Sequence, residues 1–395
     1  MSAIAWVMLV GAGIAGLALV MTLRNLRLYR PAPAFEEARA ALGDDPPRVT
    51  VCIPARNEEK HLAACVRSIL GDGDAGAYPN LRVLVYDDQS EDGTSAVLAR
   101  LAAADSRVRA ARTHPLPAGW NGKQWACDIM GRQAAEDGSP WLLFTDADVR
   151  FEPGAVWRAV AEAQRTGVDL LSTFPRQVTG SLGEALLVPM IHFILLSYLP
   201  IDRMRATTEP GTSAGCGQFL LVRREAYLAA GGHAACRGSM HDGIMLPRAL
   251  RRAGFRTDLF DGTDLAWCRM YRGGAAAWRG FAKNAFEGVG SVTLLSVTTL
   301  VHLVGHVLPW AYLGAAALGG GSDRVAVGLA GAAVVFALVQ RGALADRFLH
   351  SAAGAALHPI GVLAMTAVQW HSWYLMMTGK RAWRGRVGME MVVSR

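Results

Sequence analysis

Three acidic segments follow apolar runs of the chain, and their side chains could bind a metal ion. PARNEE (Pro54–Glu59) and DDQSEDGT (Asp87–Thr94) follow the first two runs, and DAD (Asp146–Asp148) follows a later one. Carboxylates crowded at one edge repel one another unless a positive charge lies among them. Mg²⁺ or Mn²⁺, held by one or two carboxylates and a substrate diphosphate, meets that need. The pattern therefore predicts a divalent cation and a diphosphate-bearing substrate.

Each segment alone also has a purely structural interpretation. Asn57 could cap a helix, and Ser90 or Asp92 could cap the helix after the second segment. Two Asp residues one position apart are common by chance. Three such segments in order favour a site, because ligands of open α/β sheets bind beyond the carboxyl ends of the strands.

The apolar runs themselves predict strands buried on both faces of a parallel sheet. They are VTVCI (Val49–Ile53), LRVLVY (Leu81–Tyr86), WLLFT (Trp141–Thr145) and VDLLS (Val168–Ser172). Ala-rich segments such as Glu58–Leu70 and Thr94–Ala104 separate them and predict helices. We therefore expect an α/β domain over residues 48–288, with a mostly parallel, Rossmann-like sheet.

The composition and the N-terminus point to a membrane protein. Of 395 residues, 52% are hydrophobic and 18% charged, which excludes a disordered chain, and the net charge is +7. Ile4–Leu23 carries no charge and has the length, about 20 residues, that a membrane-spanning helix needs. Arg24, Arg27 and Arg30 follow it, which predicts a cytoplasmic location for the rest. Residues 1–30 are thus expected to form an anchor and 31–47 a linker.

The C-terminal part, residues 289–379, predicts two to three further spans. The candidates are Val289–Leu318, Val325–Val339, which is short, and Pro359–Met377. Three full spans would place the basic tail, residues 380–395, outside, against the positive-inside rule, so we favour a cytoplasmic tail. Leu182–Leu199 is apolar but contains Glu184, Pro189 and His192, which favours an interfacial helix. Six cysteines without a CxxC pair fit a reducing compartment.

The ordered set PARNEE, DDQSEDGT and DAD resembles family 2 glycosyltransferases with the GT-A fold, over about Arg48–Gly288. The resemblance implies that the first two segments bind the nucleotide, with Asp88 or Asp87 on the uracil edge. It implies a metal held at Asp148 and Asp146, with Asp146 also facing the ribose and sugar. The nucleotide-sugar residues it implies are Pro54, Ala55, Arg56, Asn57, Glu58, Asp87, Asp88, Ser90, Lys123, Asp146 and Ala147.

LPAGWNGKQWAC (Leu116–Cys127) is similar to the P-x-G-W-x-G-K segment of a bacterial branch of this family. That branch includes hopanoid-associated and diaponeurosporenoate (carotenoid) glycosyltransferases, and ceramide glucosyltransferase is a more distant relative. Lys123 would place a cation near the acidic edge, as a phosphate contact requires. A lysine exposed at the surface is the structural alternative.

The acceptor side is expected around HDGIMLPRALRRAG (His241–Gly254), where the family usually has a Glu-Asp pair and this chain has His241-Asp242. Asp242 is the expected general base, since a carboxylate suits a hydroxyl that becomes acidic in the transition state. A simple helix N-cap is the alternative. MYRGG (Met270–Gly274) and WRGFAKN (Trp278–Asn284) replace the Q-x-x-R-W of processive members. The acceptor-side candidates are Gly215, Cys216, Gly217, His241, Trp278, Arg279 and Lys283.

The sequence thus predicts an inverting hexosyltransferase that moves a hexose, glucose by resemblance, from a UDP-sugar to a membrane lipid. We expect a multi-pass protein of the inner or plasma membrane, with a cytoplasmic catalytic domain and no nucleic-acid partner. Transfer to a polyprenyl phosphate or a glycan chain is an alternative, and an inactive nucleotide-binding membrane scaffold is another. A transporter is disfavoured, because the spans hold few ionisable residues.

Overall fold

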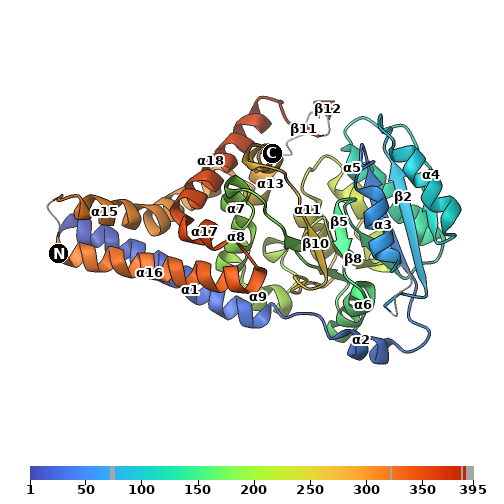
Figure 1. The fold of residues 1–395 in the computed structure, drawn as a ribbon, viewed down its shortest axis with the longest axis horizontal. Coiled ribbons are helices and arrows are strands. Elements are labelled where there is room, and N and C mark those ends of the chain that lie inside the picture. Colours follow the sequence, from blue (N-terminus) through green and yellow to red (C-terminus); the bar gives the residue numbers. More distant parts are fainter. Residues whose placement is uncertain (72–75, 321–322, 384–385, 388–395) are drawn as a thin grey trace. The chain divides into compact units, whose positions relative to one another are not determined.

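The computed structural model describes residues 1–71, 76–320, 323–383 and 386–387 (Figure 1). It divides into two compact units, which are described separately. The sheet unit contains Tyr29–Arg176 and Ile201–Arg269, and the helical unit contains Met1–Leu28, Gln177–Pro200 and Met270–Ala382. Arg384 and residues 388–395 of the expected basic tail lie outside the described residues.

A seven-stranded sheet forms the centre of the sheet unit, in the order β3-β2-β1-β4-β8-β6-β9. β1 is parallel to β2 and β4, whereas β8 is antiparallel to β4 and β6. The strands are β1 (Val49–Ala55), β2 (Leu81–Asp87), β3 (Val108–Ala110), β4 (Trp141–Phe144), β6 (Leu170–Ser172), β8 (Leu220–Arg223) and β9 (Thr257–Leu259). The expected α/β architecture with a mostly parallel sheet is confirmed.

Helices and a small second sheet surround these strands. The helices are α2 (Phe35–Leu42), α3 (Leu62–Leu70), α4 (Thr94–Ala104), α5 (Gly122–Glu136), α6 (Ala155–Thr166), α9 (Ile201–Ala206), η1 (Pro210–Thr212), α10 (Arg224–Ala229), η2 (Gly232–Cys236) and α11 (Asp242–Arg252). The small sheet is made of β5 (Val149–Phe151), β10 (Ala266–Cys268) and β7 (Arg176–Gln177).

The strand register brings the ends of β1, β2 and β4 to one edge. Val49 pairs with Leu81 and with Trp141, and the pairing runs in parallel as far as Ala55 with Asp87. The three acidic segments therefore all start from the same edge of the sheet, as the sequence predicts. The helix expected from Glu58 begins only at Leu62, because Glu58 and its neighbours form a loop.

An apolar core fixes α5 and α11 against the sheet. Cys52, Phe144 and Leu220 of the strands pack in one buried cluster with Met130 of α5 and Leu246 of α11. Each side chain of this size contributes about 1.5–3 kcal/mol when it is fully buried. The first turns of both helices are thereby held above the carboxyl edge of the sheet.

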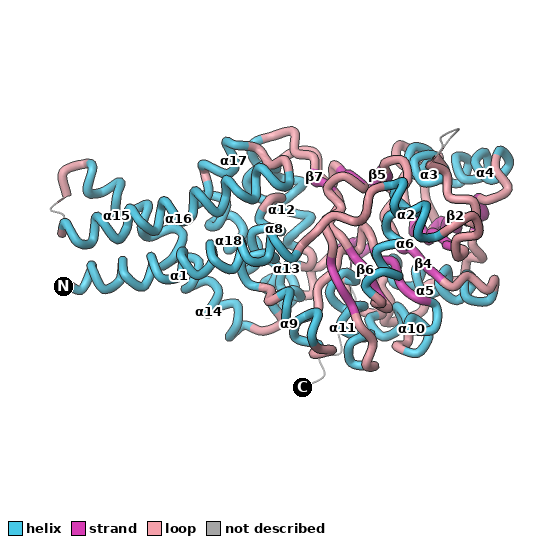
Figure 2. The backbone as a smooth tube through the Cα atoms, turned by 90° about the horizontal axis from the view of Figure 1, so that it is seen from below, coloured by secondary structure: helices cyan, strands magenta, loops and turns pink. Residues whose placement is uncertain are grey.

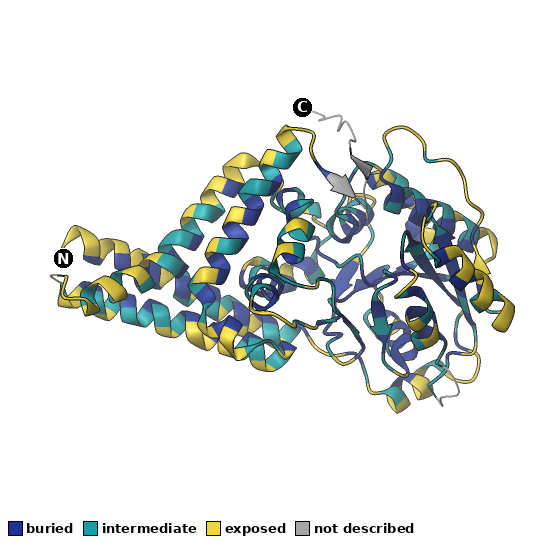
Figure 3. Ribbon diagram, turned by 45° about the horizontal axis from the view of Figure 1, so that its top comes forward, coloured by how far each residue is buried: buried dark blue, intermediate teal, exposed yellow. Residues whose placement is uncertain are grey.

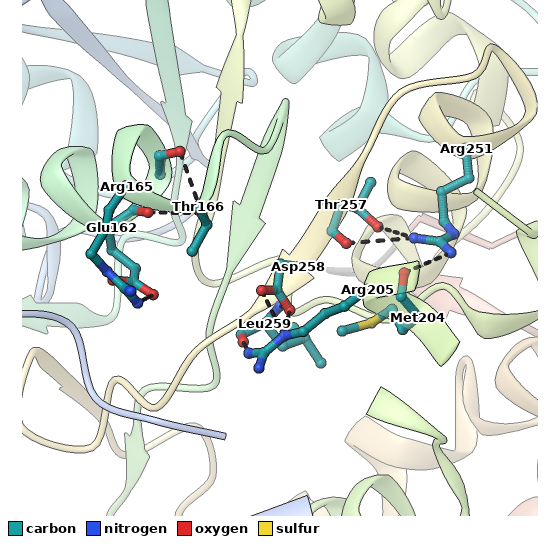
Figure 4. A network of polar contacts seen from close by, with 10 residues as sticks. Glu162, Arg165, Thr166, Met204, Arg205, Arg251, Thr257, Asp258 and Leu259 are labelled. Carbon is teal, nitrogen blue, oxygen red and sulfur yellow. Dashed lines mark hydrogen bonds and ion pairs between the residues drawn. The ribbon is translucent and has the colours of Figure 1, made fainter. Parts of the chain in front are cut away.

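Polar contacts anchor the far end of α11 (Figure 4). The buried guanidinium of Arg251 donates to the carbonyl oxygens of Glu209 (2.8 Å), Thr207 (2.7 Å) and Met204 (3.1 Å). Neighbouring Arg205 pairs with Asp258 of β9 at 2.9 Å. Because a guanidinium with several carbonyl partners resists displacement, the network fixes the axis of α11 and so the position of its first residue, Asp242.

The helical unit consists of helices of very different lengths. They are α1 (Ala3–Leu28), α7 (Leu182–Leu187), α8 (Met190–Tyr198), α12 (Gly274–Ala282), α13 (Ala285–Val289), α14 (Val292–His302), the π-helical turn η3 (Leu303–Val307), α15 (Leu308–Ala317), α16 (Arg324–Phe348), α17 (Ala352–Ala356) and α18 (His358–Met377). Within the described residues three segments are long and apolar enough to cross a membrane: Ala3–Leu28, Val292–Ala317 and Arg324–Phe348.

α1 and α16 lie side by side (Figures 1 and 2). Small residues line their contact: Ala5 packs with Ala326, and Ala12 with Ala333. Such residues let two helix backbones approach closely in a bilayer. The paired positions increase together along both helices, so the two helices are parallel. Their outer faces are exposed and apolar (Figure 3), as lipid contact requires.

Three predicted segments of this unit differ in detail from the structure. The short candidate Val325–Val339 belongs to a 25-residue helix that continues to Phe348. Pro359–Met377 forms α18, which is not among the three described segments that are long and apolar enough to span. Leu182–Leu199 is divided into α7 and α8 at Val188 and Pro189.

Candidate active site

The loops that follow β1 and β2 are tied to each other. The Arg56 Nη1 atom donates to the carbonyl oxygens of Asp88 (2.6 Å) and Gln89 (3.1 Å). The backbone N–H of Asn57 donates to Ser90 Oγ at 3.0 Å, and Asn57 has a positive φ of 55°. Asn tolerates this left-handed conformation better than most residues. Asn57 is therefore a loop residue that joins two segments, and not the helix cap considered from the sequence.

Further bonds extend this connection. The Glu58 amide donates to Thr94 Oγ1 at 2.8 Å, and the Glu59 amide donates to Asp92 Oδ2 at 3.2 Å. Asp92 Oδ1 also accepts from the backbone N–H of Thr94 at 3.0 Å, although the N-cap position of α4 is occupied by Gly93. Asp87 accepts from the Ser90 amide at 3.0 Å. The two segments thus form one rigid rim at the carboxyl edge of the sheet.

Lys123 joins two carboxylates from different parts of the chain. Its Nζ lies 2.6 Å from Asp146 Oδ1 and 2.9 Å from Asp242 Oδ2. Lys123 lies in the first turn of α5, where the Asn121 side chain caps the helix by accepting from the Lys123 amide at 2.9 Å. Its side chain is 18% exposed, so the surface-lysine alternative is wrong. The GWNGK, DAD and HD segments therefore converge.

Opposite charges govern ionisation in this cluster. Burial would lower the pKa of Lys123, but Asp146 and Asp242 outweigh burial and hold that pKa well above its ordinary value. Burial would likewise raise the pKa of Asp242, yet Lys123 and then His233 lower it below its ordinary value. Asp242 is therefore an ionised carboxylate and Lys123 an ammonium at neutral pH.

Two close-packed glycine contacts set the position of Asp242. A Cβ atom on Gly217 would lie 2.3 Å from Asp242 Oδ1, and one on Gly243 would lie 2.6 Å from the Gly215 carbonyl oxygen. Since real Cβ atoms do not approach so closely, only glycine fits at both positions without a shift. The segment Gly215, Cys216, Gly217 thus packs directly on the start of α11. Asp242 is the first residue of this helix and accepts from its own neighbour, the Gly243 amide, at 2.9 Å.

His233 is a buried residue near this cluster that the sequence reasoning did not single out. Its Nδ1 lies 2.9 Å from the hydroxyl oxygen of Tyr227, and its ring centroid lies 4.5 Å from that of Phe144. Burial lowers the pKa of His233 to about 4, although Asp242 raises it. His233 ends the stretch Gly215–His233, which begins with the acceptor-side candidates Gly215, Cys216 and Gly217, so its position in the sequence shortly after them was the available signal.

Asp146 and Asp148 lie in the turn between β4 and β5, with Ala147 buried between them. Within the described residues no group of three or more His, Cys, Asp and Glu side chains is arranged to hold a metal by itself. Mg²⁺ and Mn²⁺ are commonly bound by one or two carboxylates plus substrate phosphates. Two carboxylates one residue apart at the site edge fit that donor set.

The remaining acceptor-side candidates belong to two environments. His241 precedes α11, and its amide donates to Ser239 Oγ at 2.9 Å. Trp278, Arg279 and Lys283 belong to the helical unit, where Trp278 Nε1 donates to His371 Nδ1 at 2.9 Å and Arg279 is exposed.

Two nucleotide-side candidates, Pro54 and Ala55, are the last residues of β1. They lie beneath the rim, opposite Tyr86 and Asp87 of β2 in the strand register.

The sheet order is consistent with the GT-A fold. The model of "Glycosyl transferase family 2" matches residues 50–229. The match covers a little under half of the chain and supports a glycosyltransferase of this kind. This agrees with the resemblance seen in the ordered motifs.

Proteins similar to this chain in sequence share one name. A 4,4'-diaponeurosporenoate glycosyltransferase of Staphylococcus haemolyticus is 24% identical over 283 residues, which are 70% of this chain and 69% of that protein. The protein of the same name from Staphylococcus aureus (strain USA300) is 26% identical over 257 residues, and the match spans 64% of each chain, slightly under two thirds.

Among solved structures, the mannosyltransferase PcManGT from Pyrobaculum calidifontis, in complex with GDP-Man and Mn²⁺, superimposes with a TM-score of 0.57. It is 20% identical, and the match covers 93% of this chain and 99% of that one. At this identity the similarity establishes the fold, including helices outside the matched family domain.

Proposed function

We propose that the protein transfers a hexose from a UDP-sugar to a hydroxyl or carboxyl group of a membrane lipid, with inversion at the anomeric carbon. The observation that carries this proposal is the pair of contacts from Lys123 Nζ to Asp146 and Asp242. One cation there links an expected metal-side carboxylate to the expected general base. A donor site and an acceptor site would have to meet at such a point.

The donor would bind along the rim of the sheet. The joined loops after β1 and β2 would hold the uridine, with Asp88 or Asp87 on the base. Asp148 and Asp146 would hold Mg²⁺ or Mn²⁺ on the diphosphate, which the Mn²⁺ complex of PcManGT supports by analogy of fold. Lys123 would lie close to the phosphate that leaves with UDP. Glucose is the proposed sugar.

Transfer then requires one displacement. The acceptor oxygen attacks the anomeric carbon and forms the new C–O bond, while the bond from that carbon to the UDP oxygen breaks. Asp242 takes the acceptor proton, and Lys123 offsets negative charge on the departing UDP. The divalent cation, when bound, would add further charge stabilisation at the diphosphate.

The ionisation of Asp242 bears on the acceptor. Because its pKa is lowered, Asp242 is a weak base that suits a proton acidified in the transition state. An acceptor that is already ionised needs no base at all. A carboxylate-bearing lipid is therefore a good candidate, and the shared name of the Staphylococcus relatives supports a carotenoid-type acceptor. The same argument keeps a polyprenyl phosphate as the second candidate.

The helical unit supports a topology with the active site in the cytoplasm. Arg24 and Arg27 at the end of α1 place that end inside by the positive-inside rule. α16 is parallel to α1, so it would also end inside, and Val292–Ala317 would cross outward before it. α18 would then remain on the inner side. We therefore propose that the chain continues into the cytoplasm after α18 and that the membrane is the inner or plasma membrane.

Transfer of labelled sugar tests the proposal. Purified protein in detergent with Mn²⁺ would be incubated with UDP-[¹⁴C]glucose and a bacterial lipid extract that contains carotenoid acids. We expect label in the lipid phase and, by mass spectrometry, lipids heavier by one hexose. The Asp242→Asn variant should no longer form products in which the sugar is attached to a lipid hydroxyl. The control variant Asp137→Asn, at the far end of α5, should still form them. Label that stays in the aqueous phase with every lipid and every UDP-sugar would refute the proposal.

A further inference from the structure

A second charged cluster lies in the helical unit, around Arg341 of α16. Arg341 is fully buried, although α16 is one of the three segments that are long and apolar enough to span. Its Nη1 donates to the Pro189 carbonyl oxygen at a long 3.5 Å. Its Nε and Nη2 atoms have no hydrogen-bond partner within the described residues. Burying such a cation without compensation is costly, so its presence at this position points to a function.

Several histidines interact with this arginine directly or through one another. Arg341 acts electrostatically on His192, His350 and His358, and His358 is coupled in turn to His302 and His306. We call these six residues the Arg341 cluster: Arg341, His192, His302, His306, His350 and His358. His350 Nε2 lies 3.2 Å from His192 Nδ1, and His358 Nε2 lies 3.1 Å from His306 Nδ1. The cluster joins α8, α14, η3, α16 and α18.

The cluster has unused hydrogen-bond donors. In a neutral His306–His358 pair one ring donates to the other, which leaves one N–H and one bare nitrogen on the two outer positions. Those outer atoms, His306 Nε2 and His358 Nδ1, have no partner within the described residues. Both ring nitrogens of buried His302 are likewise without one, and a neutral ring always carries one N–H. The cluster therefore has several N–H groups, on Arg341 and on these histidines, without an acceptor within the described residues.

No carboxylate of the helical unit meets this need. Glu184 accepts from the Gly180 amide at 2.8 Å beside its own helix, and Glu287 pairs with Arg381. Asp323 caps the opposite end of α16, and Asp346 is exposed. These four are the unit's only acidic side chains in the sequence. The Arg341 cluster thus carries positive charge and donors without an anion from its own unit.

The depth of the cluster suits a lipid head group. Gln340, the neighbour of Arg341, donates to Thr22 of α1 at 2.8 Å. Thr22 directly precedes the basic flank of Arg24 and Arg27, which marks the membrane–water boundary. His306 lies in η3, a π-helical turn of a kind often found at functional sites. Arg341 therefore lies near the level at which head groups are found.

We propose that the Arg341 cluster is a binding site for the anionic oxygens, phosphate or carboxylate, of one membrane lipid. The guanidinium supplies the charge and a planar pair of donors, and the imidazoles add neutral donors. A phospholipid phosphate and a lipid carboxylate share this chemistry. The site is separate in its residues from the proposed donor site, so it does not depend on sugar transfer.

Native mass spectrometry of the full-length protein tests this proposal. Protein would be reconstituted in nanodiscs of phosphatidylcholine that contain either phosphatidylglycerol or a long-chain fatty acid. The lipids that stay bound to the protein after its release from the nanodisc would be counted. We expect wild type to retain one anionic lipid from at least one arm and Arg341→Gln to retain it about tenfold less. Arg324→Gln removes the same charge from the opposite, exposed end of α16 and should behave as wild type.

Melting temperature provides a second readout that detects misfolding. The anionic lipid that binds should raise the melting temperature of wild type but not of Arg341→Gln, whereas in pure phosphatidylcholine both proteins should melt cooperatively. Retention in the phosphatidylglycerol arm alone would identify a phosphate site, and in the fatty-acid arm alone a carboxylate site. Equal retention by wild type and Arg341→Gln, or no retention in either arm, would overturn the proposal.

Discussion

Lys123 in the sheet unit and Arg341 in the helical unit are both cations withdrawn from water, but their surroundings differ. Lys123 contacts two carboxylates within 2.9 Å, whereas Arg341 faces imidazoles and one distant carbonyl oxygen. The first cation is balanced by the protein itself. The second lacks an anion within its unit. The difference indicates which kind of partner each site requires: a neutralised metal–diphosphate donor at the first, and a negative group at the second.

Removing the base from the balanced site should have the largest effect. Asp242→Asn leaves a side chain of nearly the same shape that cannot take a proton, so we expect kcat to fall roughly 10²- to 10⁴-fold with an alcohol acceptor. A carboxylate acceptor should lose far less. Rates with the two acceptor classes would be compared with those of Asp242→Glu. An equal, small loss with both classes would contradict the assignment of Asp242 as base.

Removing the cation itself should have a smaller effect. Lys123→Met leaves Asp146 and Asp242 without their shared partner, and kcat/KM should fall by about 100-fold. Lys123 lowers the pKa of Asp242, so its loss should raise that pKa. Because the base acts only when ionised, the acid limb of the kcat/KM profile should move to higher pH. An unchanged acid limb with a stably folded variant would show that Lys123 does not act on the base.

A change in packing beside Asp242, with every charge kept, should have a smaller effect on catalysis. Gly217→Ala places a methyl group where Asp242 Oδ1 lies, which should displace the carboxylate from Lys123 and lower kcat by about tenfold. Gly211 serves as the control, because a Cβ atom added there would meet no heavy atom within 4 Å. Gly211→Ala should retain wild-type kcat. Equal activity of the two variants would indicate that the position of Asp242 is not critical.

The smallest effect should come from the unbalanced site, and with the opposite sign. In pure phosphatidylcholine, where no anionic lipid is present, Arg341→Gln removes an uncompensated buried charge and should stabilise the protein by about 1 kcal/mol. Lys123→Met should destabilise it, because it exposes two carboxylates to each other. Thermal unfolding of both variants in the same nanodiscs gives the comparison. A marked loss of stability in Arg341→Gln would mean that Arg341 is already satisfied by the protein.

The sequence predicted the sheet better than the helical unit, for a physical reason. Continuous apolar runs such as Val49–Ile53 have one stable location in an α/β fold, a strand covered on both faces. The end of β1 at Ala55 and the late start of α3 at Leu62 depend on bonds between loops, such as Glu58 to Thr94, that no local pattern encodes. The antiparallel direction of β8 likewise follows from its connection and not from its residue types.

The convergence of Lys123, Asp146 and Asp242 was only partly predictable. Motif order indicated that all three belong to one site, but their spacing over more than a hundred residues does not specify a contact. The close fit of Gly217 against Asp242 and the burial of His233 emerge only from packing. The Arg341 cluster is still harder to predict from the sequence, because its six residues are spread over several elements and form no sequence pattern.

Calorimetric titration of UDP into the purified protein, with and without Mn²⁺, tests the central claim most directly. Wild type should bind UDP tightly only when Mn²⁺ is present, and Asp148→Ala should abolish that Mn²⁺-dependent part, because one of the two proposed metal-binding carboxylates is gone. Binding of UDP that is identical with and without Mn²⁺ and unchanged in Asp148→Ala would contradict a sugar-nucleotide metal site at DAD.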